Sequence, residues 1–151
     1  MPPQLVAGIV HIEVGGDPLI NDDVGYTLRS GALKEDRDRT SFYNVSIQVR
    51  RAIQSLDYDI SNDVSDTQRR YIINSLKQPQ TNIFIAAKHI SDLRDIYFKG
   101  VPAKRLSREQ IKIIATRYNR GPDISFNELI KDMSNGATVL KRWNRMSILL
   151  R

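Results

Sequence analysis

Residues 79–97 read PQTNIFIAAKHISDLRDIY, a long run in which apolar residues recur every three or four positions. This spacing places them on one face of an α-helix. Pro79 suits the first turn of such a helix, where a backbone N–H has no intrahelical partner in any case. The run therefore predicts a long amphipathic helix from Pro79 to Tyr97.

The same spacing predicts helices along most of the chain, which makes the expected fold class mostly α. They span 5–13, 47–56, 65–76, 107–118, 125–133 and 137–149. Ser107 with Gln110, and Ser125 with Glu128, have the spacing of capping boxes. Residues 17–41 are rich in Asp, Gly, Arg and Ser, and their weak periodicity predicts a long loop or a small hairpin.

Length and composition limit the classes of protein. The chain has 151 residues, 40% of them hydrophobic and 26% charged, which predicts a single domain over residues 1–151. No apolar run approaches the roughly 18 residues of a membrane span, so membrane insertion is not expected. The net charge of +6 favours negatively charged partners, such as nucleic acid, anionic lipid or an acidic cell-wall polymer. The chain has no cysteine, which excludes disulfides and cysteine-based zinc sites.

A single carboxylate ends the first predicted helix. Glu13 shares a helix face with Leu5, Ile9 and Ile12. Burial disfavours the ionised form of a carboxylate and raises its pKa, and cleavage of a glycosidic bond needs such an acid to protonate the leaving oxygen. The alternative is an ordinary helix-terminal glutamate that reaches solvent or pairs with an arginine.

Four blocks of sequence follow one another along the chain. They are AGIVHIEV at 7–14, YNVSI at 43–47, LKQPQTNIFIAAKHISDL at 76–93 and ATRYNRG at 115–121. Together they resemble the lysozyme-like superfamily, in particular goose-type lysozymes and soluble lytic transglycosylases. The corresponding family patterns are apolar-Ala-x-Ile-x-x-Glu-Ser, Gly-Leu-Met-Gln-Ile, Leu-x-x-Pro-x-x-Asn-Ile-x-x-Ala-Ala-x-x-Leu-x-x-Leu and Ala-x-x-Tyr-Asn-x-Gly.

The resemblance implies a lysozyme-like fold and a role for several residues. Glu13 would be the catalytic acid, Tyr118 would lie near its carboxyl group, and Asn119 would bind sugar groups. Asn82 and Ile83 would be structural, joining the long central helix to the wall of the active site. The substrate would be peptidoglycan, cleaved at the β-1,4 bond between N-acetylmuramic acid and N-acetylglucosamine. No cofactor is implied, because two carboxyl groups and water suffice.

Two residues of the second block depart from the family pattern. Tyr43 stands where the family usually has Gly, and Ser46 stands where a Gln usually reaches the sugar. Both are candidate substrate-binding residues, but a tyrosine would narrow the cleft and a serine is too short for the same hydrogen bond. A catalytically inactive glycan-binding module is therefore an alternative function.

A second carboxylate would decide the type of reaction. An inverting hydrolase needs a base about 6.5–9.5 Å from the acid, whereas a lytic transglycosylase lets the sugar's own hydroxyl close an anhydro ring. Asp36 and Asp38 lie just ahead of the second block, in a place similar to where goose-type lysozymes carry an acidic residue, and Asp38 is the first candidate because it is closer to residues 40–42. Asp22 and Asp23 lie nearer Glu13. Acidic residues are frequent over 22–38, which favours hydrolysis. A solvated loop aspartate is the alternative for each.

Other residues carry weaker predictions. His11 and His89 have no second ligand at metal spacing, so no metal site is expected. Phe126 and Trp143 lie at helical spacing from aliphatic residues and are predicted to belong to the core.

A basic nucleic-acid binder is a further alternative, though not the favoured one. It would need three pairs of basic residues on one face. These pairs are Arg50-Arg51, Arg69-Arg70 and Lys141-Arg142.

The expected place of action is the periplasm or the cell wall. The first residues carry no recognisable secretory signal, so we expect export by another route or as part of a longer chain. A bacterial toxin or secretion-system effector, or a phage- or conjugation-associated enzyme, fits these features. An effector would imply an immunity protein, a proteinaceous inhibitor, as partner.

Overall fold

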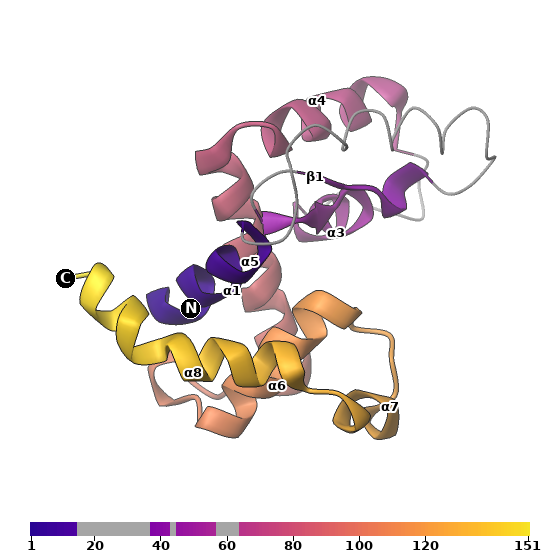
Figure 1. The fold of residues 1–151 in the computed structure, drawn as a ribbon. Helices are drawn as coiled ribbons and strands as arrows, with labels where there is room; N and C mark the ends of the chain where they lie inside the picture. The colour runs from indigo at the N-terminus through magenta and orange to yellow at the C-terminus, as the bar shows by residue number, and fades with distance from the viewer. Residues whose placement is uncertain (15–36, 43–44, 57–63) are drawn as a thin grey trace. The chain divides into compact units, whose positions relative to one another are not determined.

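The computed structural model describes residues 1–14, 37–42, 45–56 and 64–151. The chain divides into two compact units, each described here by itself (Figure 1). Unit 1 comprises Met1–Ile12 and Ala87–Arg151, and unit 2 comprises Glu13–Ala86. Helices α1 (Pro3–Val14) and α5 (Pro79–Tyr97) contribute residues to both units. The described elements are mostly helical, which confirms the predicted fold class at the level of mostly α.

The described part of unit 2 contains a small sheet, a short 3-10 helix and two α-helices besides its parts of α1 and α5. These elements are η1 (Arg37–Arg39), β1 (Ser41–Phe42), β2 (Ile47–Gln48), α3 (Val49–Ser55) and α4 (Asp66–Leu76). The two strands are antiparallel, with Ser41 opposite Gln48 and Phe42 opposite Ile47. The helix predicted from Ile47 therefore begins two residues later, because Ile47 and Gln48 pair with β1. Most of the predicted loop at 17–41 lies outside the described residues.

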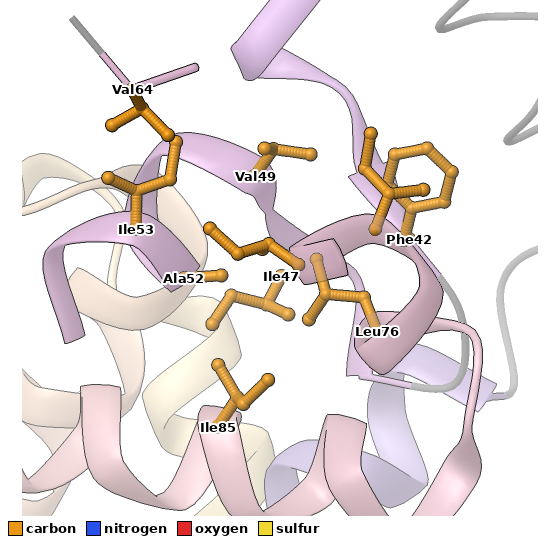
Figure 2. Packing of buried hydrophobic residues seen from close by; sticks show 10 residues of the cluster. Phe42, Ile47, Val49, Ala52, Ile53, Val64, Leu76 and Ile85 are labelled. Carbon is orange, nitrogen blue, oxygen red and sulfur yellow. The ribbon is translucent and has the colours of Figure 1, made fainter. Parts of the chain in front are cut away.

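The core of unit 2 is a cluster of buried aliphatic residues together with the aromatic ring of Phe42 (Figure 2). Its ten members come from β1, β2, α3, the residue two positions before α4, α4 itself and the first turns of α5: Phe42, Ile47, Val49, Ala52, Ile53, Val64, Ile72, Ile73, Leu76 and Ile85. α3 contacts η1, β2 and α4. The short strands are thus held by apolar burial on α3, α4 and α5, since two residue pairs alone stabilise a sheet very little.

Unit 1 is helical throughout its described elements. They are the greater part of α1, the C-terminal part of α5, η3 (Ala103–Arg105), α6 (Arg108–Arg120), α7 (Phe126–Lys131) and α8 (Ser134–Leu149). The capping box of Ser107 and Gln110 is confirmed at the start of α6. Ser125 caps α7 by accepting a hydrogen bond from the Glu128 N–H. α5 has the predicted bounds, and α8 begins three residues earlier than predicted.

Helices α6 and α8 pack closely because α8 has a glycine at the contact. A Cβ atom added at Gly136 would lie 2.2 Å from the Lys112 carbonyl oxygen and 2.7 Å from Thr116 Oγ1. No side chain fits at such distances. Gly136 therefore allows the first turn of α8 to approach the backbone of α6.

Two arginines near the end of α6 hold the segment that leads to α7 and α8. Arg117 is buried, and its Nη1 donates to the carbonyl oxygens of Pro122 and Ile124, each at 2.6 Å. Its guanidinium carbon lies 4.1 Å from the centroid of the Tyr97 ring, and the Tyr97 hydroxyl donates to the same Pro122 oxygen. Arg120 donates from Nη1 to the carbonyl oxygens of Glu128 and Asp132, at the end of α7.

The prediction of a core position is wrong for Phe126. Its side chain is 55% exposed, because α7 is a six-residue helix that buries only Leu129 fully. Trp143 on α8 is half-buried. Helical spacing identifies a common face, but it does not say whether another element covers that face.

Candidate functional site

Glu13 lies in the last turn of α1, where the sequence predicted it. The residue is partly exposed and follows buried Ile9 by four positions and buried Leu5 by eight, so it leaves the helix on their face. It is the only acidic residue of α1. The carboxyl end of a helix carries partial negative charge, which makes it the less favourable end for a second negative charge.

Asp38, the predicted second catalytic carboxylate, is engaged in an ion pair. Arg69 Nε on α4 lies 3.0 Å from Asp38 Oδ2 and 3.2 Å from Oδ1. Both side chains are mostly buried, with 14% of Asp38 and 18% of Arg69 exposed. Arg69 also donates to the Val64 carbonyl. The pair therefore fastens η1 to the start of α4.

A buried asparagine braces the connection between β1 and β2, which contains most of the second sequence block. Asn82 on α5 is fully buried, and its Oδ1 accepts a hydrogen bond from the Val45 N–H at 3.2 Å. Its Nδ2 donates to the Phe42 carbonyl at 3.1 Å. One amide thus holds both sides of the connection between β1 and β2. These contacts join the long helix α5 to the β1–β2 hairpin, so Asn82 has a structural role.

Of the two unusual residues in that block, the structure describes Ser46 alone, and Tyr43 lies outside the described residues. Ser46 is half-buried, and its φ of 39° places it in the left-handed region. This conformation is uncommon for a residue other than glycine and costs about 1 kcal/mol or more. Asp22, Asp23 and Asp36, the other candidate carboxylates, also lie outside the described residues.

Tyr118 and Asn119, the predicted sugar-binding residues, lie in the last turns of α6. The Tyr118 ring is half-buried and faces the ring of buried His89, with centroids 5.7 Å apart and planes tilted by 54°. Asn119 is exposed, and its Oδ1 accepts a hydrogen bond from Asn135 Nδ2 at 2.6 Å. Unit 1 thus joins Tyr118 to His89 and Asn119 to Asn135, whereas Glu13 belongs to unit 2.

Asn135 is a functional candidate that the sequence analysis missed. It is 16 residues from Asn119, and no local pattern connects the two. The signal was Gly136, an interior glycine in an otherwise helical segment. Such a glycine has a packing reason more often than not, but the partner helix is not identified by the glycine itself.

Three of the four arginines in the basic pairs of unit 2 contact other side chains, whereas Arg70 is exposed. Arg51 is buried and donates to Gln54, Arg50 donates to Gln48, and Arg69 pairs with Asp38. Bonds of this kind hold the guanidinium groups to the protein. The observation weakens the nucleic-acid alternative, which needs those side chains for phosphate.

In the described part of the chain, no group of three His, Asp or Glu side chains is placed to hold a metal ion. None of the helices there is long and apolar enough to cross a membrane. Comparison of the chain with models of protein families, with characterised proteins and with solved structures finds no match in any of the three.

Proposed function

We propose that this protein is a muramidase that cleaves the β-1,4 bond between N-acetylmuramic acid and N-acetylglucosamine in peptidoglycan, with Glu13 as general acid. Tyr118 and Asn119 are proposed to contact the sugar. The proposal includes a lysozyme-like fold and rests on the four sequence blocks together with the placement of their residues within each unit.

The observation that carries the proposal is the position of Glu13. It is a single, partly exposed carboxylate at the end of an apolar helix, on the face of residues buried in the core. The helix holds the Glu13 carboxyl group in place, and the partial exposure of this group allows it to donate a proton to a polymer that binds at the surface. The fully buried Asn82 adds support, because the third block predicted a structural residue there.

In the proposed reaction, protonated Glu13 donates its proton to the glycosidic oxygen as the bond from that oxygen to the anomeric carbon breaks. In hydrolysis, water attacks the anomeric carbon, and a base takes its proton. Asp38 is the first candidate for that base. Glu13 leaves this step ionised and must be reprotonated before the next turnover.

Lytic transglycosylation is a second candidate, and one observation favours it. Asp38 is bound to Arg69 and mostly buried, so its carboxylate is held in a structural contact. In the transglycosylase reaction the 6-hydroxyl of the muramic acid attacks the anomeric carbon, and Glu13 alone can serve as acid and then base. The products separate the two reactions, because only hydrolysis leaves a reducing end.

The proposed place of action is the periplasm or the cell wall, and a toxin or effector role is part of the proposal. Unit 1 carries 14 Lys and Arg against six Asp and Glu, a formal charge of +8. Such an excess attracts an anionic wall polymer. An immunity protein that inhibits an effector of this kind would be expected to present acidic residues.

The test is digestion of purified peptidoglycan by the wild type and by Glu13→Gln, with mass spectrometry of the released muropeptides. We expect release by the wild type and a loss of about 10²–10⁴-fold in the variant, the usual contribution of a general acid. Glu109→Gln, an exposed glutamate at the start of α6, is the matched control and should retain activity.

Each outcome has one meaning. Reducing-end products that vanish with Glu13→Gln support hydrolysis, and anhydro products that vanish support transglycosylation. Activity that survives in Glu13→Gln refutes Glu13 as the acid. A wild type that binds peptidoglycan and releases nothing refutes cleavage and leaves the glycan-binding module.

A further inference from the structure

Two exposed amide side chains meet at the end of α6 and the start of α8. Asn119 is the next-to-last residue of α6, and Asn135 is the second residue of α8. Asn135 Nδ2 donates to Asn119 Oδ1 at 2.6 Å, and within the described part of the chain neither side chain makes another hydrogen bond. Asn119 is exposed and Asn135 half-exposed, so the pair lies at the surface of unit 1.

The meeting of the two residues follows from the close helix contact beside them. Gly136 directly follows Asn135, and its lack of a side chain lets α8 approach the backbone of α6 at Lys112 and Thr116. The pair is therefore positioned by two packed helices of unit 1. Sites built on helices hold their groups more accurately than sites on loops.

Two amides that share one hydrogen bond each keep one polar group with which they can bind a ligand. The amide that donates retains its carbonyl oxygen, and the amide that accepts retains its NH₂ group. If the oxygen and nitrogen atoms of both amides are exchanged, Asn119 becomes the donor and Asn135 the acceptor, and the pair still keeps one carbonyl oxygen and one NH₂ group. In either assignment, the pair offers one neutral acceptor and one neutral donor side by side.

We propose that Asn119 and Asn135 form a subsite for an N-acetylated sugar and that the subsite discriminates against the free amino sugar; this rests on the proposed function. The carbonyl oxygen of the pair accepts the N–H of the acetamido group, and the NH₂ group donates to a neighbouring sugar oxygen. Both contacts are neutral and suit an uncharged sugar.

The charge of unit 1 supplies the discrimination. A de-N-acetylated sugar carries an ammonium group, which needs a carboxylate and is repelled by a unit of formal charge +8. The acetamido group carries no charge and avoids this repulsion. The subsite therefore assigns Asn135 a specificity role that the four sequence blocks do not include.

The test uses the full chain carrying Glu13→Gln, labelled with ¹⁵N, and two probes: the trimer of N-acetylglucosamine and the trimer of glucosamine. We expect the acetylated trimer to shift the side-chain NH₂ signals of both Asn119 and Asn135, and to bind more tightly than the glucosamine trimer. Asn135→Ala should weaken binding of the acetylated trimer about threefold to tenfold, the loss of one hydrogen bond. Asn144→Ala, an exposed asparagine of α8, is the matched control and should leave binding unchanged.

A second variant tests the discrimination directly. Asn135→Asp places a carboxylate in the pair, to which Asn119 can still donate, and it should shift the preference towards the glucosamine trimer. A merely structural role for Asn135 would alter the thermal unfolding of these variants without altering the preference.

The proposal is overturned if neither trimer binds, if the acetylated trimer binds without moving the two NH₂ signals, or if both trimers bind equally. Its failure is distinct from that of the proposed function. Cleavage by the wild type with unmoved signals refutes the subsite alone, whereas moved signals without cleavage by the wild type refute the muramidase alone.

Discussion

The two units of this chain differ in formal charge and in the groups that hold particular arginines. Unit 1 has a formal charge of +8, whereas unit 2 has nine Lys and Arg against eleven Asp and Glu, a formal charge of −2. In unit 2, Arg69 meets the carboxylate of Asp38. In unit 1, Arg94 also meets a carboxylate, that of the exposed Asp95, whereas Arg117 and Arg120 donate to backbone carbonyl oxygens.

Each unit also holds an irregular segment with one buried polar side chain. Asn82 braces the hairpin in unit 2 with a neutral donor and a neutral acceptor. Arg117 braces the turn after α6 with donors alone, and its Nε has no hydrogen-bond partner among the described residues. The comparison shows that a neutral amide can both accept a hydrogen bond from an N–H group and donate one to a C=O group. An arginine can only donate, so it stabilises a turn whose carbonyl oxygens point towards it.

The largest effect is expected from Asn82→Asp. The variant keeps an acceptor for the Val45 N–H but loses the donor to the Phe42 carbonyl, and it places a charge in a fully buried position. We expect a loss of about 3–5 kcal/mol in the free energy of unfolding at neutral pH, measured by urea denaturation.

The sign of its pH dependence follows from burial. A buried carboxyl group has a raised pKa, so the folded variant holds its proton more tightly than the unfolded chain. The loss should therefore be smaller at acid pH and grow as pH rises above about 4. Asn74→Asp, at an exposed position of α4, is the control. Equal losses for the two variants would contradict the bracing role of Asn82.

Arg117→Met should cost less, about 2–3 kcal/mol. The variant loses the hydrogen bonds to Pro122 and Ile124 and the stacking on Tyr97, but it retains apolar volume and removes one charge from a strongly positive unit. Thermal unfolding measures the effect, with Arg105→Met at an exposed position as control. An unchanged melting temperature would show that the unit is not braced by this arginine.

The helices of both units were predictable because their signals are local. The bounds of α5 follow from Pro79 and the apolar spacing, and the start of α6 follows from Ser107 with Gln110. Strand β2 fell within the helix predicted from Ile47, because a two-residue strand is too short to show a period of two.

Contacts between distant residues were not predictable in the same way. Arg69 is 31 residues from Asp38, so the sequence alone presents Asp38 as a loop carboxylate and not as half of an ion pair. Asn135 and Asn119 meet only because two helices pack at Gly136. Glu13 was predictable in position, since both the helix and its end are local features.

Asp38→Asn tests whether the ion pair of unit 2 is structural, and its expected effect is about 1–2 kcal/mol of unfolding free energy. The contact is mostly buried, which makes it worth more than an exposed pair. The matched control is Asp92→Asn, which breaks the more exposed pair of Lys88 and Asp92 in unit 1 and should cost less than about 0.5 kcal/mol. Both are measured by urea denaturation.

The same variant separates the two proposed reactions. A transglycosylase should keep its rate of muropeptide release in Asp38→Asn, after correction for the folded fraction. A loss of more than about 10²-fold would identify Asp38 as the base of a hydrolase.

The smallest effect concerns Asp132, an exposed carboxylate of the positive unit. Hydrogen bonds from the Ser134 side chain and from its backbone N–H lower the pKa of Asp132 below the ordinary 3.8, and the charge of Arg120 adds to this. A lowered pKa in the folded state gives stability that is present above the unfolded pKa and is lost as pH falls through the folded pKa.

We therefore expect the carboxyl signal of Asp132, followed by NMR, to titrate below pH 3.8. Ser134→Ala should move the midpoint up more than Arg120→Met does, because the hydroxyl contact is the larger cause. The reverse order would mean that the charge of unit 1, rather than the local hydrogen bonds, controls this carboxylate.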